Sequence, residues 1–194
     1  MNPDLLLASR SPRRAELLRT LGVAFAVVDV EVDETPRSGE SPPIYVERLA
    51  RAKAEAGKTA SGNVLPVLAA DTTVVCDEEI LGKPADAGDA TRMLRRLSGR
   101  WHSVFTGVAL AGTQLATVVV ETRVCFRVLT EAEITAYWAS GEPADKAGAY
   151  GIQGLGGALV ARIEGGWSNV VGLPLAETLT LLSHEGIPHA LSAR

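Results

Sequence analysis

Residues 5–22 read LLLASRSPRRAELLRTLG, and this stretch predicts a strand that leads directly into a helix. Its first four residues, Leu5 to Ala8, are apolar or small, as in a buried strand. Ser11 and Pro12 are typical of a helix N-cap and of the first helical position, and Gly22 is typical of a helix end. A strand followed by a helix is the repeating unit of α/β folds.

The rest of the chain alternates between strand and helix patterns, with hairpins among them. Polar residues 33–43 predict a loop. We expect strands at residues 24–32, 66–76 and 80–81, hairpins over 104–128 and 158–171, and helices over 44–57, 90–99, 130–138 and after Pro174. Because helices are interleaved with hairpins, the pattern predicts an α/β fold with a mixed sheet.

Composition excludes several classes of protein. The chain has 194 residues and a net charge of −4, which argues against a general nucleic-acid-binding protein. The N-terminal apolar run is too short for a signal peptide, and no apolar run approaches the roughly 20 residues that span a membrane. Cys76 and Cys125 lie in apolar stretches and are interpreted as buried thiols in a reducing compartment. We therefore expect a cytoplasmic protein with neither a membrane nor a nucleic-acid partner.

Two arginines at the start of the first predicted helix break a local rule. Arg13 and Arg14 follow the Ser11 cap, and cations in a first turn oppose the helix dipole by about 0.3–1 kcal/mol each. A bound anion would reverse the sign, because free N–H groups, the Ser9 and Ser11 hydroxyls and both guanidinium groups would surround it. The alternative is a pair of solvated arginines on a surface helix.

Lys53 breaks a second rule, because it lies on the apolar stripe of the second predicted helix. It follows Val46, Leu49 and Ala50 at helical spacing, so its side chain shares their face. A lysine in this position either extends to water at the edge of the stripe or points into a polar site. The residues alone leave both alternatives open.

Asp71 breaks a third rule, because it interrupts the apolar strand VLAADTTVV at residues 67–75. Aspartate is depleted in strands, and a buried carboxylate is unfavourable unless it is paired or bound to a metal. Asp71 is therefore a candidate metal ligand or general base, with a strand-end turn cap as the alternative. Lys83 follows in a predicted hairpin, and its spacing allows the ammonium group to return towards Asp71.

Familiar nucleotide and metal motifs are absent from the sequence. It contains no phosphate-binding loop that ends in Gly-Lys-Ser/Thr, and the glycines of residues 148–157 do not fit the dinucleotide fingerprint. His102, His184 and His189 are scattered and lack zinc spacing. What remains is a basic, hydroxyl-rich anion site with a few carboxylates. These are the residue types that metal-assisted attack on a polyphosphate requires.

The ordered set of motifs resembles the Maf family, also called septum-formation inhibitor-like proteins. The segment LASRSPRR at residues 7–14 is similar to the N-terminal signature of the family. The match continues through nearly the whole chain, at Glu16–Leu18, Glu34, Ala52–Ala54, Ala70–Thr72, Gly82–Pro84, Leu97–Gly99, Thr106–Val108, Asp145–Gly154 and Val171–Pro174. We therefore treat residues 1–194 as a single Maf-like domain. One departure is Glu78, where glycine is common, and it leaves the type of that turn open.

This resemblance implies a fold and a reaction. The fold is a mixed, strongly twisted sheet with flanking helices in two lobes around a cleft, similar to inosine triphosphate pyrophosphatases. The reaction is hydrolysis of nucleoside triphosphates between the α and β phosphates with a divalent cation, Mg²⁺ or Mn²⁺. Arg13, Thr72 and Gln153 match the branch that acts on dTTP and UTP, whereas a sister branch prefers 7-methyl-GTP.

The resemblance and the residue chemistry together indicate a role for each site residue. Glu34 and Asp71 are expected to hold the metal, and Asp71 also to orient or deprotonate the attacking water. Gln153 offers both a donor and an acceptor to a pyrimidine edge. The substrate-binding residues are expected to be Ser9, Ser11, Arg13, Arg14, Lys53, Thr72, Lys83 and Gln153. Lys146 is either a further phosphate contact or a surface lysine.

Two other functions stay open at the level of sequence. The first is the same chemistry on another base, such as 7-methyl-GTP or a modified pyrimidine. The second is a non-catalytic regulator of septum formation whose site is vestigial. A homodimer is expected in either case, because symmetric dimers are the commonest assembly.

Overall fold

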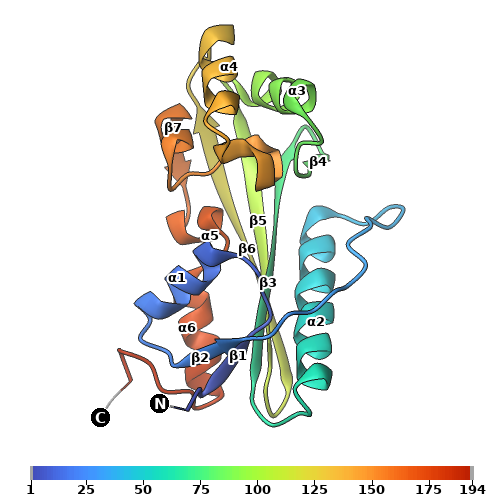
Figure 1. Cartoon of the computed structure of the whole chain (residues 1–194), viewed down its shortest axis with the longest axis vertical. Helices are drawn as coiled ribbons and strands as arrows, with labels where there is room; N and C mark the ends of the chain where they lie inside the picture. Colours follow the sequence, from blue (N-terminus) through green and yellow to red (C-terminus); the bar gives the residue numbers. More distant parts are fainter. Residues whose placement is uncertain (1, 193–194) are drawn as a thin grey trace. The chain divides into compact units, whose positions relative to one another are not determined.

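The computed structural model describes residues 2–192, which form an α/β fold (Figure 1). The strands are β1 (Leu5–Leu7), β2 (Phe25–Val27), β3 (Val67–Cys76), β4 (Glu79–Leu81), β5 (Trp101–Ala111), β6 (Leu115–Phe126) and β7 (Val160–Glu164). The helices are α1 (Pro12–Thr20), α2 (Pro42–Ala60), α3 (Ala87–Leu97), α4 (Glu131–Ala139), α5 (Trp167–Val171) and α6 (Leu175–His184). Short 3₁₀ turns at Glu142–Asp145, Ala147–Ala149 and Leu155–Leu159 connect α4 to β7.

Over residues 2–192, seven strands form one mixed sheet. The order is β2-β1-β3-β5-β6-β7, and β4 pairs with β3 outside this path. β1 runs parallel to β2 and to β3, whereas the β3–β4 and β6–β7 pairs are antiparallel. The predicted α/β class with a mixed sheet is confirmed. None of the helices in this part of the chain combines the length and the apolar character needed to cross a membrane.

The chain divides into two compact units. The first takes its described residues from the ranges Met1–Asp71, Thr106–Val120 and Gly172–Arg194, and the second consists of Thr72–Phe105 and Glu121–Val171. The first unit therefore contains α1, α2, α6, β1 and β2, and the second contains β4, β7 and the helices α3 to α5. One boundary falls inside β3, directly after Asp71.

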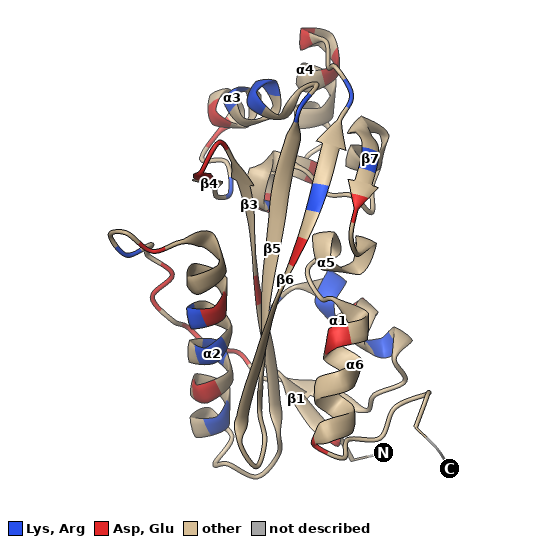
Figure 2. Cartoon of the chain, turned by 180° about the vertical axis from the view of Figure 1, so that it is seen from behind, with Lys and Arg blue, Asp and Glu red and all other residues tan. Residues whose placement is uncertain are grey.

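In the first unit, α2 lies on one side of the strands and α1 and α6 lie on the other (Figures 1 and 2). Charged residues of both signs follow one another along α2 in Figure 2, and its buried face carries Val46, Leu49 and Ala50 as predicted. Gly107 of β5 permits this packing, because a Cβ atom there would lie 2.5 Å from the Val46 carbonyl oxygen. A backbone atom cannot move aside for that contact as a flexible side chain can, so only glycine fits.

The first turn of α1 has the predicted structure. The Ser11 hydroxyl caps the helix by accepting a hydrogen bond from the Arg14 N–H at 3.4 Å, and Pro12 occupies the first helical position. Leu17 and Leu18 are buried, so they tie the helix to the core of the first unit. The N-terminus of α1, together with Arg13 and Arg14, is therefore held in a fixed place.

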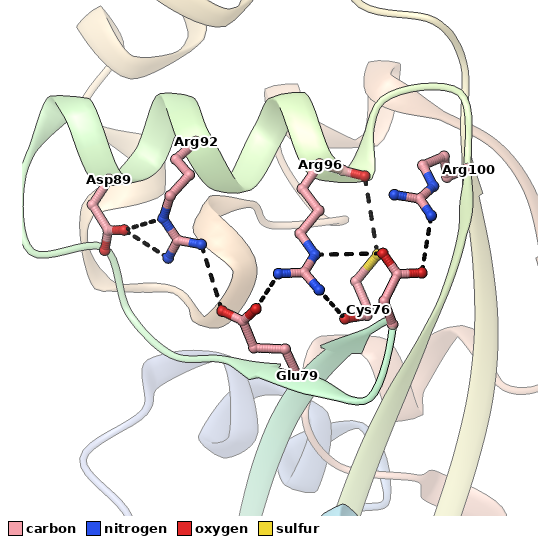
Figure 3. A network of polar contacts seen from close by, with 7 residues as sticks. Cys76, Glu79, Asp89, Arg92, Arg96 and Arg100 are labelled. Atoms are coloured by element: carbon pink, nitrogen blue, oxygen red, sulfur yellow. Dashed lines mark hydrogen bonds and ion pairs between the residues drawn. The ribbon is translucent and has the colours of Figure 1, made fainter.

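In the second unit, charged contacts tie α3 to the β3–β4 turn (Figure 3). Arg96 contacts the Glu79 carboxylate and donates to the Cys76 carbonyl oxygen at 3.0 Å. Arg100, just after the helix, donates to Asp77 at 2.9 Å. The turn that the sequence left open is thus a two-residue connection that α3 holds from the side, since Cys76 pairs directly with Glu79.

Three local predictions were wrong. The strand expected at residues 24–32 is limited to Phe25–Val27, and the segment after it is irregular. Trp167–Val171 is the helix α5 and not a hairpin strand, and β7 pairs with β6 instead. The buried Asn169 explains the helix, because its side-chain amide donates to the Val104 carbonyl and to the Thr122 hydroxyl. The hairpin expected over 104–128 is shorter, because β6 ends at Phe126 and Val128, beyond its end, is 77% exposed.

Candidate active site

Three of the predicted charged residues meet in the first unit. Asp71 lies in the middle of β3 and is buried, which excludes the strand-end turn cap. The Lys53 ammonium group, projecting from α2, lies 2.7 Å from the Asp71 carboxylate and 2.5 Å from the Glu34 carboxylate. Only 14% of the Lys53 side chain is exposed, so this lysine points into a polar site and does not extend to water. Glu34 comes from the loop between β2 and α2, and about half of its side chain is exposed.

Two residues that sequence reasoning missed hold the Glu34 loop in place. The Tyr45 hydroxyl donates to the Glu34 carbonyl oxygen at 2.9 Å. Arg48 donates to both oxygens of Glu40, at 2.6 and 2.8 Å, and to the Thr35 carbonyl oxygen at 3.1 Å. Both side chains start from the first turns of α2, so this helix fixes Lys53 and the loop together. Burial, followed by the nearby negative charges of Asp71 and Glu34, raises the pKa of Tyr45 to about 12.

The serines and Arg14 form a second group at the start of α1. The Arg14 guanidinium donates to the Gly172 carbonyl oxygen at 2.8 Å and to the Ser9 hydroxyl at 3.3 Å. The Ser9 hydroxyl also accepts from the Ser11 N–H at 3.2 Å. Arg14 is thus not a solvated surface residue, which excludes the alternative of a solvated arginine at this position. Arg13, next to it, is half-buried.

The two groups are electrostatically linked. Burial lowers the pKa of Arg14, and the negative charges of Asp71 and Glu34 act in the opposite direction. Burial likewise raises the pKa of Asp71 above its ordinary value, and the cations Lys53 and Arg14 offset part of that rise. A carboxylate whose pKa is raised towards neutral is a better proton acceptor than an ordinary surface aspartate. The structure therefore places a buried carboxylate, whose pKa burial raises, beside two cations that offset part of that rise.

Glu34 and Asp71 fit a divalent cation that prefers oxygen ligands, such as Mg²⁺. Both carboxylates face the same Lys53 nitrogen, so two hard oxygen ligands converge. Mg²⁺ is commonly held by one or two carboxylates and completed by water and substrate phosphates. Within residues 2–192, no group of three or more His, Cys, Asp or Glu residues is arranged to hold a metal. The donor set therefore suits an ion that is shared with a substrate, and it does not suit a structural four-ligand site.

The remaining predicted residues belong to the second unit. Thr72 follows Asp71 in β3 and is half-buried, and Lys83 is exposed two residues beyond β4. Gln153 is exposed on the loop between the second and third 3₁₀ turns. Lys146 donates to the Glu142 carbonyl oxygen at 2.6 Å and to Asp145 at 2.7 Å, so its ammonium group is bound within this loop region. The substrate contacts of Thr72, Lys83 and Gln153 stay predictions.

Comparison with known proteins places this chain in a class. Residues 4–185 match the family described as Maf-like protein, and the chain belongs to that family. A relative from Myxococcus xanthus, named dTTP/UTP pyrophosphatase, is 56% identical over 191 residues, which cover 97% of each chain. A second protein of that name, from Hahella chejuensis, is 54% identical over 186 residues, which cover 94% of this chain and 92% of the relative.

A solved structure supports the fold independently. A HAM1 protein from Coxiella burnetii superposes on 94% of this chain with a TM-score of 0.51, and all of that chain is covered. The two sequences are only 18% identical, so the likeness concerns the fold alone. The fold of this chain is therefore shared with a protein that differs widely from it in sequence.

Proposed function

We propose that this protein is a nucleoside triphosphate pyrophosphatase that hydrolyses dTTP and UTP to the monophosphate and pyrophosphate. The observation that carries the proposal is the buried Asp71, held by Lys53 opposite Glu34 and electrostatically linked to Arg14. A buried base between cations suits the hydrolysis of a polyanion. The two relatives described above, each more than half identical to this chain, bear the name of the same activity.

The cations and hydroxyls at the start of α1 bind the triphosphate in this proposal. Free N–H groups at a helix N-terminus attract phosphate, and the guanidinium groups of Arg13 and Arg14 add charged hydrogen bonds. The Ser9 and Ser11 hydroxyls lie within hydrogen-bond distance of this same turn. Lys53 and Lys83 supply further positive charge, which stabilises the charge that develops on the phosphates as the anhydride bond breaks.

Asp71 accepts the proton of the attacking water. The water oxygen forms a bond to the α phosphorus. The P–O bond between this atom and the bridging oxygen breaks, and its electron pair leaves with pyrophosphate. Glu34 and Asp71 would hold Mg²⁺ or Mn²⁺, which would neutralise phosphate charge as a Lewis acid. Lys53 contacts both carboxylates and keeps their negative charges close together in the resting protein.

Base choice rests on Arg13, Thr72 and Gln153. These residues correspond to the pyrimidine branch of the family, and the Gln153 amide offers one donor and one acceptor to a uracil or thymine edge. A cytoplasmic location and a homodimer belong to the same proposal. The free thiols of Cys76 and Cys125 support a reducing compartment, and symmetric dimers are the commonest assembly.

The test is pyrophosphate release from dTTP, UTP, CTP, dGTP and 7-methyl-GTP with Mg²⁺ or Mn²⁺. We expect turnover of dTTP and UTP only, and a loss of about 10²–10⁴-fold in Asp71→Asn, the range for removal of a general base. Asp29→Asn is the matched control, because Asp29 lies at the surface in an exposed pair with Arg10. Turnover of 7-methyl-GTP instead would overturn the base assignment, and silence with every nucleotide would favour the regulatory binding protein.

A further inference from the structure

The loop that carries Gln153 is held by hydrogen bonds from its backbone to one carboxylate. Glu142, at the start of the first 3₁₀ turn, accepts hydrogen bonds from the Leu155 N–H at 2.8 Å and from the Gly156 N–H at 3.0 Å. The Tyr137 hydroxyl of α4 donates to the same carboxylate at 2.7 Å. Three donors therefore converge on Glu142, two of them from the backbone just after Gln153.

The backbone before Gln153 is held by Tyr137, the residue that donates to Glu142. The Tyr137 hydroxyl oxygen accepts the Gly151 N–H at 3.0 Å, two residues before Gln153. Glu142 and Tyr137 thus hold the backbone on both sides of Gln153 through one connected set of hydrogen bonds. Tyr137 is itself buried in the core of the second unit, so the set is attached to a rigid helix.

The glycines of the loop fit this support closely. A Cβ atom at Gly154 would collide with the Glu142 carboxylate, and one at Gly156 would collide with the Tyr137 hydroxyl. The backbone lies against these two side chains because it lacks side chains of its own at these positions. Burial acts to raise the pKa of Glu142, but the hydrogen bonds from Gly156, Tyr137 and Leu155 outweigh it and lower the pKa overall. The carboxylate is therefore ionised at neutral pH and is a strong acceptor.

We propose that Glu142, acting through Tyr137 and the loop backbone, is a positioning residue that sets the orientation of Gln153 and hence the selection of the base. The inference rests on the proposed pyrophosphatase function, in which Gln153 contacts the base. Glu142 does not touch the reacting phosphates in this scheme, so its effect falls on substrate affinity and base preference. The chemical step, which depends on Asp71, continues at its normal rate.

Two variants test this role. Glu142→Gln keeps the size of the side chain but turns one of its two acceptor positions into a donor, which then faces a backbone N–H or the tyrosine hydroxyl. Tyr137→Phe removes only the hydroxyl and keeps the buried ring. Glu131→Gln on α4 is the matched control, because Glu131 pairs with Arg95 at the surface and has no contact with the loop among the described residues.

The measurement is kcat and KM for UTP, dTTP and CTP in the wild type and the three variants. For Glu142→Gln we expect KM for UTP to rise about tenfold or more, as for loss of a hydrogen bond to a charged group, with kcat within about threefold of the wild type. The preference for UTP over CTP should fall with it, and Tyr137→Phe should show a smaller change in the same direction. The Glu131→Gln values should equal those of the wild type.

The outcomes separate this inference from the proposed function. If the wild type is active and both loop variants have its KM and base preference, the role of Glu142 is overturned. The pyrophosphatase assignment then still stands. A purely structural role would lower the melting temperature and the active fraction without changing KM or base preference, and that result would also overturn it. A wild type that hydrolyses none of the nucleotides would overturn both proposals. If Glu142→Gln does not fold, Tyr137→Phe decides the question.

Discussion

Replacement of Glu78 by glycine should make the protein more stable. Asp77 and Glu78 connect β3 to β4 with φ angles of +51° and +63°, so both are in the left-handed region. A two-residue hairpin with positive φ at both positions is a type I′ turn, for which Asp-Gly is a preferred sequence. The chain already has the aspartate, and Asp77 is needed because it pairs with Arg100 and Arg96. Glu78 is the exposed residue that carries the strain.

The magnitude follows from two opposing effects. A side chain with a Cβ atom in the left-handed region costs roughly 1–2 kcal/mol. Glycine at this position loses more backbone entropy on folding, which takes back roughly 0.5–1 kcal/mol. The net gain for Glu78→Gly is therefore about 0.5–1 kcal/mol, or a rise in melting temperature of about 1–4 °C for a chain of this length.

The assay is urea unfolding together with thermal unfolding, and two variants act as controls. Glu78→Ala removes the same charge but keeps the Cβ atom, so we expect it to give none of the gain. Glu55→Gly, on an exposed face of α2, should lose about 1 kcal/mol because glycine weakens a helix interior. The reasoning would be refuted if the glycine variant at position 78 were no more stable than the alanine variant.

Two further predictions concern pH. Burial lowers the pKa of His102 from its ordinary 6.5 to about 4, so the unfolded chain binds this proton first on acidification. Stability should fall by about 2 kcal/mol between pH 7 and pH 5, as urea unfolding would show, and His102→Gln should remove that part of the loss. Lys53→Met should move the acidic limb of the kcat profile to higher pH, because Asp71 loses the cation that lowers its pKa. An unshifted limb would argue against Asp71 as the base.

Local signals in the sequence were sufficient where a residue and its partner lie within one or two turns of each other. The Ser11 cap of α1 was predicted and is confirmed. The helix predicted over 130–138 is also present as α4, and Thr130 and Glu133 form a capping box at its start. Lys53 was recognised because helical spacing placed it on a buried face, and that face is indeed buried. Each of these patterns depends on geometry that a single helix determines by itself.

The failures arose where a distant partner decides the outcome. Trp167–Val171 has the composition of a strand, but Asn169 forms its hydrogen bonds with β5 and β6, and this contact favours a helix. The roles of Tyr45 and Arg48 depend on a loop that begins more than ten residues before them, so no spacing rule could reveal them. Glu142 resembles an ordinary surface glutamate in sequence, because the N–H groups that it binds belong to glycine-rich backbone without side chains.

The residues that broke local rules in the sequence compensate one another in the structure. Arg14 opposes the dipole of α1, Lys53 lies on an apolar stripe, and Asp71 places a carboxylate inside an apolar strand, so each is unfavourable by itself. In the folded chain, Asp71 lies against Lys53 and its negative charge acts on Arg14. With Glu34 included, two cations face two carboxylates, and the adjacent Arg13 leaves the group with one positive charge in excess. This charge balance offsets the unfavourable placement of each residue in the folded chain, and the excess positive charge suits the polyanion of the proposed function.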